Sequence, residues 1–146
     1  LHQGRFTRGK GLFTSIEYKP AAEVVDAEYP FWLTTGRLHA HYHGGTMTRN
    51  SPSLDREIKE CLLEMNPEDA VELGISEGDW VVIESRRGSI SSKVKLTRTI
   101  GKKAVFIPFH FIESRVNILT NPKFDPIAKI PEFKVCAVRI EKRTNP

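Results

Sequence analysis

The chain has 146 residues, with 22 lysines and arginines against 18 aspartates and glutamates and a formal charge of +4. This length is enough for about one domain with its own core, and the mild positive charge favours an anionic partner without naming one. Two distant cysteines, Cys61 and Cys136, fit reduced thiols in a cytoplasmic protein better than a disulfide framework. No signal peptide and no apolar run of roughly 18 residues is present.

Residues 1–28 predict an irregular N-terminal arm or linker. The basic, glycine-rich "GRFTRGKGLF" and the later "YKPAAEVVDAEYP" show neither helical nor strand periodicity. Because the chain begins at Leu1 rather than Met, we expect the arm to lead in from a preceding domain of a longer chain. Residues 29–146 are then expected to form one domain.

The first elements of that domain are short. The apolar, β-rich "FWLTTG" predicts a buried strand that ends at Gly36 and delivers a long loop. "SLDREIKECLLEM" is ambiguous in period, and we interpret it as a turn of helix that begins at Ser53 and runs into apolar residues. "NPEDAVELG" predicts a capped helix with Asn66 at the N-cap, Pro67 at the first helical position and Gly74 as terminator.

The second half of the domain reads as strands. Residues 80–96 predict a hairpin that turns at Arg86–Gly88, and "KVCAVRIEK" predicts a closing strand. "KKAVFIPFHF" predicts another strand, which Pro108 makes either an edge strand or one that ends near a bulge. The proline-rich "NILTNPKFDPIAKIPEF" predicts a loop. Many short strands with two short helices indicate a mainly β protein, a β-barrel with short helices.

The loop after the first strand, "TTGRLHAHYHGGTMTR", allows two interpretations. In an extended segment His39, His41 and His43 share one face, as zinc, iron or copper ligands do, although the nearest downstream carboxylate is Asp55. Alternatively, the loop binds phosphate: Gly36 allows close backbone approach and Arg37 supplies a forked donor. Hydroxyl groups follow in the same loop, on Thr46 and Thr48.

Three further residues are candidates for a site. Asn117 offers a donor and an acceptor to a heterocycle, or simply forms a turn. His110 lies between two phenylalanines and is interpreted as a packed histidine. Lys134 precedes the last strand and either reaches solvent from its edge or meets a ligand. No Ser/His/Asp set, activated cysteine or paired buried carboxylate indicates catalysis, so the residues favour a binding module.

In order, these segments resemble the C-terminal dinucleotide-binding domain of the molybdopterin oxidoreductases, and most of all that of formate dehydrogenase alpha subunits. The resemblance covers Tyr29 to Glu141 and rests on six motifs in order: "YPFWLTTGR", "HYHGGTMTR", "MNPEDAVELGISEGDWVVIESRRGSI", "AVFIPFHF", "NILTN" and "DPIAKIPEFKVCAVRIE". It implies a six-stranded double-psi β-barrel of the aspartate decarboxylase-like kind.

The resemblance also implies a cofactor, bis-molybdopterin guanine dinucleotide with molybdenum or tungsten. The loop after the first strand would hold the phosphate and pterin groups of the cofactor through Gly36, Arg37, His41 and Thr46. Asn117 would meet a pterin, and Lys134 would lie near the cofactor. The metal ligand, the acid/base histidine and an iron–sulfur cluster are expected in other domains. No residue of this segment is therefore expected to be catalytic or to bind a metal.

The implied partners are the remaining domains of the catalytic subunit and electron-transfer subunits with iron–sulfur clusters or flavin, with no nucleic acid. The full subunit would oxidise formate to CO₂. Three alternatives stay open: the same domain of a nitrate reductase-like oxidoreductase, a histidine-loop metalloenzyme, and a basic β-barrel that binds nucleic acid or another partner. The last is motivated by the basic arm and by Phe106, Phe109 and Phe111.

Overall fold

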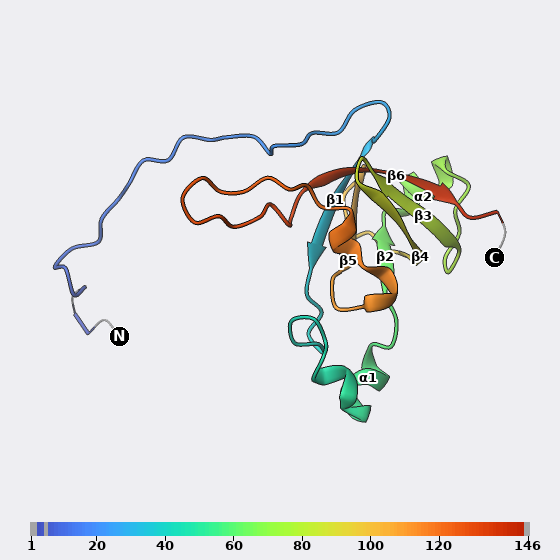
Figure 1. The fold of residues 1–146 in the computed structure, drawn as a ribbon, viewed down its shortest axis with the longest axis horizontal. Helices are drawn as coiled ribbons and strands as arrows, with labels where there is room; N and C mark the ends of the chain where they lie inside the picture. The colour runs from blue at the N-terminus through green and yellow to red at the C-terminus, as the bar shows by residue number, and fades with distance from the viewer. Residues whose placement is uncertain (1–2, 5, 145–146) are drawn as a thin grey trace.

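The computed structural model describes residues 3–4 and 6–144, and its centre is a closed barrel of six strands (Figure 1). In chain order the strands are β1 (Phe31–Gly36), β2 (Leu62–Met65), β3 (Trp80–Ser85), β4 (Gly88–Leu96), β5 (Ala104–Pro108) and β6 (Cys136–Lys142). Around the barrel they follow the order β1-β5-β2-β4-β3-β6. The mainly β, six-stranded double-psi barrel is confirmed.

Strand pairing in the barrel is mixed. β1 pairs in parallel with β5, and β2 in parallel with β4, while the other neighbours are antiparallel. β5 therefore lies between β1 and β2, and the prediction of an edge strand is wrong. Pro108 is instead the last residue of β5, opposite Gly36 in the register, so the missing N–H of proline falls where the strand ends.

The helices are short. α2 (Pro67–Glu72) confirms the predicted capped helix: the Asn66 side chain accepts a hydrogen bond from the Glu68 N–H at 3.0 Å, and Gly74 has a φ of +65°. α1 (Pro52–Glu57) begins after an N-cap at Ser51, slightly earlier than predicted. The remaining helical turns are 3₁₀: η1 (Thr48–Asn50), η2 (Ile112–Ser114) and η3 (Val116–Ile118).

The expectation that helix α1 runs on into the apolar "CLLEM" is wrong, because this segment is strand β2. Leu63 and Met65 are fully buried, while Leu62 and Glu64 are only partly buried. This alternation is the two-residue period of a strand, and four residues are too few to reveal it in the sequence.

The hydrophobic core fills the barrel and is built from alternate strand residues. Its members with no exposed surface are Leu63, Met65, Ala70, Val81, Ile83, Val105, Ile107, Leu119, Ala137 and Val138. Leu119 comes from the segment after η3, so the chain that follows β5 is itself fixed to the barrel interior.

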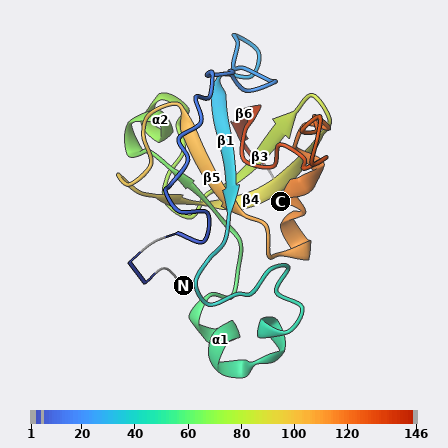
Figure 2. The same cartoon turned by 90° about the vertical axis from the view of Figure 1, so that its left-hand side faces the viewer.

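The N-terminal segment before β1 contains no helix or strand among its described residues, and it extends away from the barrel (Figures 1 and 2). The residues of this segment that contact the rest of the chain include three that come shortly before β1 in the sequence. Glu23 and Asp26 form ion pairs with Arg86, and the Ala22 N–H donates to the Glu132 carboxylate. No helix among the described residues is long and apolar enough to cross a membrane.

Substituting Leu63 with alanine removes a fully buried side chain from the centre of the core. We expect the free energy of unfolding, measured by urea denaturation, to fall by about 3 kcal/mol because the cavity cannot fully collapse. Val71→Ala is the matched control, since Val71 is 79% exposed on α2, and its effect should stay within about 0.5 kcal/mol. Equal stability of the two variants would contradict the assignment of β2 to the core.

Both cysteines are free and buried, and burial raises the pKa of each thiol to about 11. At pH about 8 only about one thiol in a thousand is then ionised, so reaction with a thiol reagent should be slow in the native chain and rapid in denaturant. Counting modified thiols over time tests this. Rapid modification of either native cysteine would show that the structure around it, β6 for Cys136 and the residue before β2 for Cys61, opens readily.

Candidate functional site

Two loops leave the barrel at the same end and build the candidate site. β1 and β5 are parallel neighbours with Gly36 opposite Pro108, so the segments after these two residues start side by side. The Phe109 N–H donates to the Gly36 carbonyl at 3.3 Å, which continues the pairing past the end of β5. A Cβ on Gly36 would lie 2.5 Å from Cε2 of Phe106, so the Phe106 ring occupies the space that a larger residue at 36 would need.

His110 joins the two loops. Its Nε2 accepts a hydrogen bond from the Leu38 N–H at 2.8 Å, and its Nδ1 is hydrogen-bonded to the carbonyl of His43. The side chain is 2% exposed, and burial lowers its pKa below the usual range of a histidine. The prediction of a packed histidine is confirmed. The two hydrogen bonds of His110 also hold the loop after β1 against the loop after β5.

His41 fixes the first loop from the inside. The ring is 4% exposed; its Nε2 donates to the carbonyl of Ile58 at 2.8 Å, and its Nδ1 lies 3.1 Å from the hydroxyl of Thr48. The ring also packs edge-on against Phe111, with the centroids 5.5 Å apart. Both ring nitrogens are therefore used within the chain, and His41 ties the histidine loop to the segment after α1.

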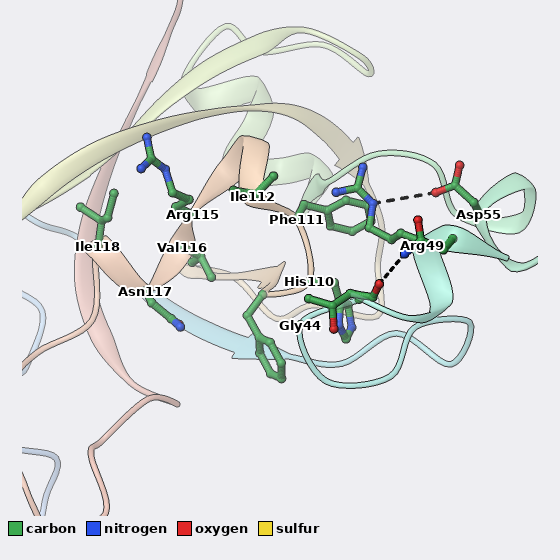
Figure 3. Close-up of a pocket in the computed structure, with 14 residues that line it drawn as sticks. Gly44, Arg49, Asp55, His110, Phe111, Ile112, Arg115, Val116, Asn117 and Ile118 are labelled. Carbon is green, nitrogen blue, oxygen red and sulfur yellow. Dashed lines mark hydrogen bonds and ion pairs between the residues drawn. The ribbon is translucent and has the colours of Figure 1, made fainter. Parts of the chain in front are cut away.

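A cavity of about 830 Å³ opens between the two loops (Figure 3). One wall comes from the first loop, including Gly45, Thr46 and Arg49, and the other from residues 109–118, including Phe109 and Asn117. This volume lies within the range of pockets that hold a nucleotide-sized ligand. Glycine is needed at 45, where φ is +74° and a Cβ would lie 3.2 Å from the carbonyl oxygen of His110.

Two cations converge on the ring of Phe109. The guanidinium of Arg37 lies 5.5 Å and the ammonium of Lys134 lies 5.6 Å from its centroid. Lys134 also donates to the Thr35 carbonyl at 2.7 Å. Arg37 also lies 3.4 Å from Nδ1 of His43. None of the ion pairs among the described residues includes Arg37 or Lys134, so both charges remain available to an anion.

Arg49 behaves differently, because acidic residues neutralise it. Its guanidinium makes two hydrogen bonds to the Glu113 carboxylate, at 3.0 and 2.8 Å, and lies 3.8 Å from Asp55. These bonds raise the pKa of Arg49 and lower that of Glu113. Since Glu113 lies on η2, the ion pair is a second link between the two loops, at the end of the cavity away from Asn117 (Figure 3).

The predicted site residues thus fall into three groups. Thr46 and Asn117 line the cavity, while Arg37 and Lys134 contact Phe109 in its wall. Gly36 and His41 are buried and shape the loops. The direct contact of each residue with a ligand stays a prediction.

Sequence reasoning missed Phe109 and Arg49. Phe109 entered the sequence analysis only with Phe106 and Phe111, as a motive for the nucleic-acid alternative, and not as part of a dinucleotide site. Its two cations come from segments that are distant in the chain, so their convergence could not be read from spacing. Arg49 is the last residue of the quoted histidine loop and received no role there, because its partner Glu113 lies on another element.

The structure does not support the histidine metal site. His39 is exposed and pairs with Glu57 at 2.7 Å, His41 is buried, and the segment forms turns rather than an extended strand. Across residues 3–4 and 6–144, no group of three or more histidine, cysteine, aspartate or glutamate side chains is placed to hold a metal ion. Of the three phenylalanines that motivated the nucleic-acid alternative, Phe111 is buried at 2% exposure, while Phe106 and Phe109 are partly buried.

Comparison with known proteins gives relatives of the same kind. Residues 31–137 match the family model described as the molydopterin dinucleotide binding domain. The chain is 50% identical over 144 residues to the F420-dependent formate dehydrogenase subunit alpha of Methanocaldococcus jannaschii. The matched residues make up 97% of this chain and 21% of that relative. The chain is 47% identical, with the same coverage, to the F420-dependent formate dehydrogenase 2 subunit alpha of Methanococcus maripaludis.

Among solved structures, acetylene hydratase from Pelobacter acetylenicus superposes with a TM-score of 0.69 over 80% of this chain and 19% of that protein. At 16% sequence identity this likeness concerns the fold alone. The chain spans about a fifth of the length of the curated relatives it matches. Because the family model matches residues 31–137, well over half of the chain, the chain belongs to the molydopterin dinucleotide binding domain family.

Proposed function

We propose that this domain binds bis-molybdopterin guanine dinucleotide, with molybdenum or tungsten, in the catalytic subunit of a formate dehydrogenase. The observation that carries the proposal is the pair of cations, Arg37 and Lys134, on the ring of Phe109, which lines the cavity between the two loops. Membership of the family supports a molybdopterin dinucleotide as the ligand. The names of the relatives support formate dehydrogenase over the nitrate reductase-like alternative.

The chemistry of the donors fits such a ligand. A dinucleotide cofactor carries diphosphate anions and flat heterocycles, which require cations and side chains that both donate and accept hydrogen bonds. Arg37 and Lys134 would hold phosphate, and Asn117 would pair with a heterocycle. Thr46 would add a hydroxyl group, while Gly36 and His41 would keep the first loop in place.

In the whole subunit this domain would bind and orient the cofactor without breaking bonds itself. The bound cofactor supplies the redox chemistry by which formate loses two electrons and a proton and becomes CO₂. The metal ligand and the iron–sulfur cluster would come from other domains. Because the relatives are F420-dependent, electrons would pass to coenzyme F420 through partner subunits with iron–sulfur clusters or flavin, in the cytoplasm.

Diguanosine diphosphate, in which a diphosphate joins two guanosines, is a suitable probe because it resembles the nucleotide end of the cofactor. We expect it to bind the domain and to shift the amide NMR signals of residues 36–46 and 109–118. Replacing Arg37 with alanine should weaken binding by about tenfold, since a charged hydrogen bond to phosphate is lost. Isothermal titration calorimetry measures the dissociation constants.

Arg98→Ala is the matched control, since it removes the same charge. Arg98 lies before β5, at the end of the barrel opposite the cavity, and its side chain is 81% exposed. Its substitution should leave the affinity unchanged. If both variants weaken binding equally, the probe binds by non-specific electrostatic attraction and not at the proposed site. Tighter binding of an oligonucleotide, with a steep salt dependence, would favour the nucleic-acid alternative.

A further inference from the structure

The hydrogen bonds of His110 define one tautomer of its ring. A backbone N–H can only donate, so the Nε2 that meets the Leu38 N–H carries no proton. A carbonyl can only accept, so the Nδ1 that meets the His43 carbonyl carries the proton. His110 is therefore neutral, with one donor and one acceptor, and each is committed to the backbone of the other loop.

The loop that His110 holds is conformationally demanding. His43 has a φ of +47°, in the left-handed region that costs energy for a residue other than glycine, and Gly45 follows with a φ of +74°. The carbonyl of His43 is the one that His110 binds, and Figure 3 shows the His110 ring beside Gly44. The bond from Nδ1 therefore acts at the point where the first loop turns toward the cavity.

We propose that His110 is a positioning residue that holds the first loop of the ligand cavity in register with the second, and that protonation of its ring releases this hold. The inference rests on the proposed function for its effect on ligand binding. Its structural part concerns the ligand-free chain. His110 lies at the edge of the cavity but is only 2% exposed, and its positioning role acts through the backbone of Leu38 and His43.

Protonation breaks the arrangement because Nε2–H would then face the Leu38 N–H, donor against donor. Among the described residues, no carboxylate contacts the His110 ring, so a positive charge on the ring would have no anionic partner. The His41 ring is tilted against His110 with the centroids 5.6 Å apart, the charge of Arg37 also disfavours a second positive charge, and Phe109 and Phe111 flank the ring. His43 contributes its carbonyl, which already accepts the Nδ1 proton.

The direction of the pH effect follows from the lowered pKa of His110. The unfolded chain then binds more protons than the folded chain below the ordinary histidine pKa of about 6.5. The contribution of His110 to stability is thus fully present above pH about 6.5 and decreases as the pH falls below it. The loops are expected to loosen over the same interval.

The test uses amide NMR of the ligand-free chain together with affinity measurements between pH about 7.5 and about 5. We expect the amide signals of Leu38 and of residues 43–45 to titrate with the midpoint of the His110 ring nitrogens. Over the same range the affinity for diguanosine diphosphate, whose diphosphate charge is constant there, should fall by about tenfold. Loop signals that ignore the titration of His110 would overturn the inference.

Three variants separate positioning from a general effect on folding. His110→Gln offers an acceptor to the Leu38 N–H without a titratable ring, so it should bind the probe with an affinity that no longer depends on pH. His110→Phe keeps an aromatic ring without either hydrogen bond and should bind more weakly at every pH. His39→Gln removes a titratable ring that is exposed on the same loop, and should retain the wild-type pH profile.

The outcomes distinguish the inference from the proposed function. If the probe binds nowhere in the pH range while the loop signals follow His110, the proposed function fails and the loop coupling stands. If the probe binds and His110→Gln retains the full pH dependence, the positioning role of His110 is wrong and the binding function stands. A folded His110→Phe variant with wild-type affinity at pH about 7.5 would also refute it.

Discussion

The parallel pairing of β1 with β5 is the constraint on which the site depends. Gly36 and Pro108 end the two strands opposite each other, so the loops that follow emerge together although they are far apart in the chain. An antiparallel neighbour would send its loop to the other end of the barrel. Gly36 also allows the Phe106 ring to approach closely, which keeps the two strand ends in contact.

Beyond the strand ends, side chains replace the strand ladder in holding the loops together. His110 bonds the backbone of the first loop at two places, and the ion pair of Arg49 with Glu113 joins them at a third. These links are polar and sit outside the barrel core, which is made by residues such as Leu63 and Ile107. Barrel stability and loop geometry can therefore change separately, as expected where binding loops are carried on a rigid scaffold.

The charges around the cavity divide into two kinds. Arg49 is neutralised by two carboxylates, and its pair with Glu113 joins the two loops. Arg37 and Lys134 instead contact the Phe109 ring without a carboxylate partner among the described residues. An aromatic face attracts both cations without cancelling their charge, so they remain able to bind an anion. The modest net charge of the chain is thus less informative than the place of these two residues.

The sequence by itself determined the local elements. Cap residues around Asn66 and Gly74 predicted α2, and alternating apolar residues predicted the β3–β4 hairpin and β6, because these signals lie within a few neighbouring residues. The ordered motifs also identified the family. Only the tertiary structure decided that β2 is a strand, that β5 is internal, that His41 is buried and that Arg37 and Lys134 meet at Phe109. Each of these follows from strand pairing and packing between distant segments, which local periodicity does not encode.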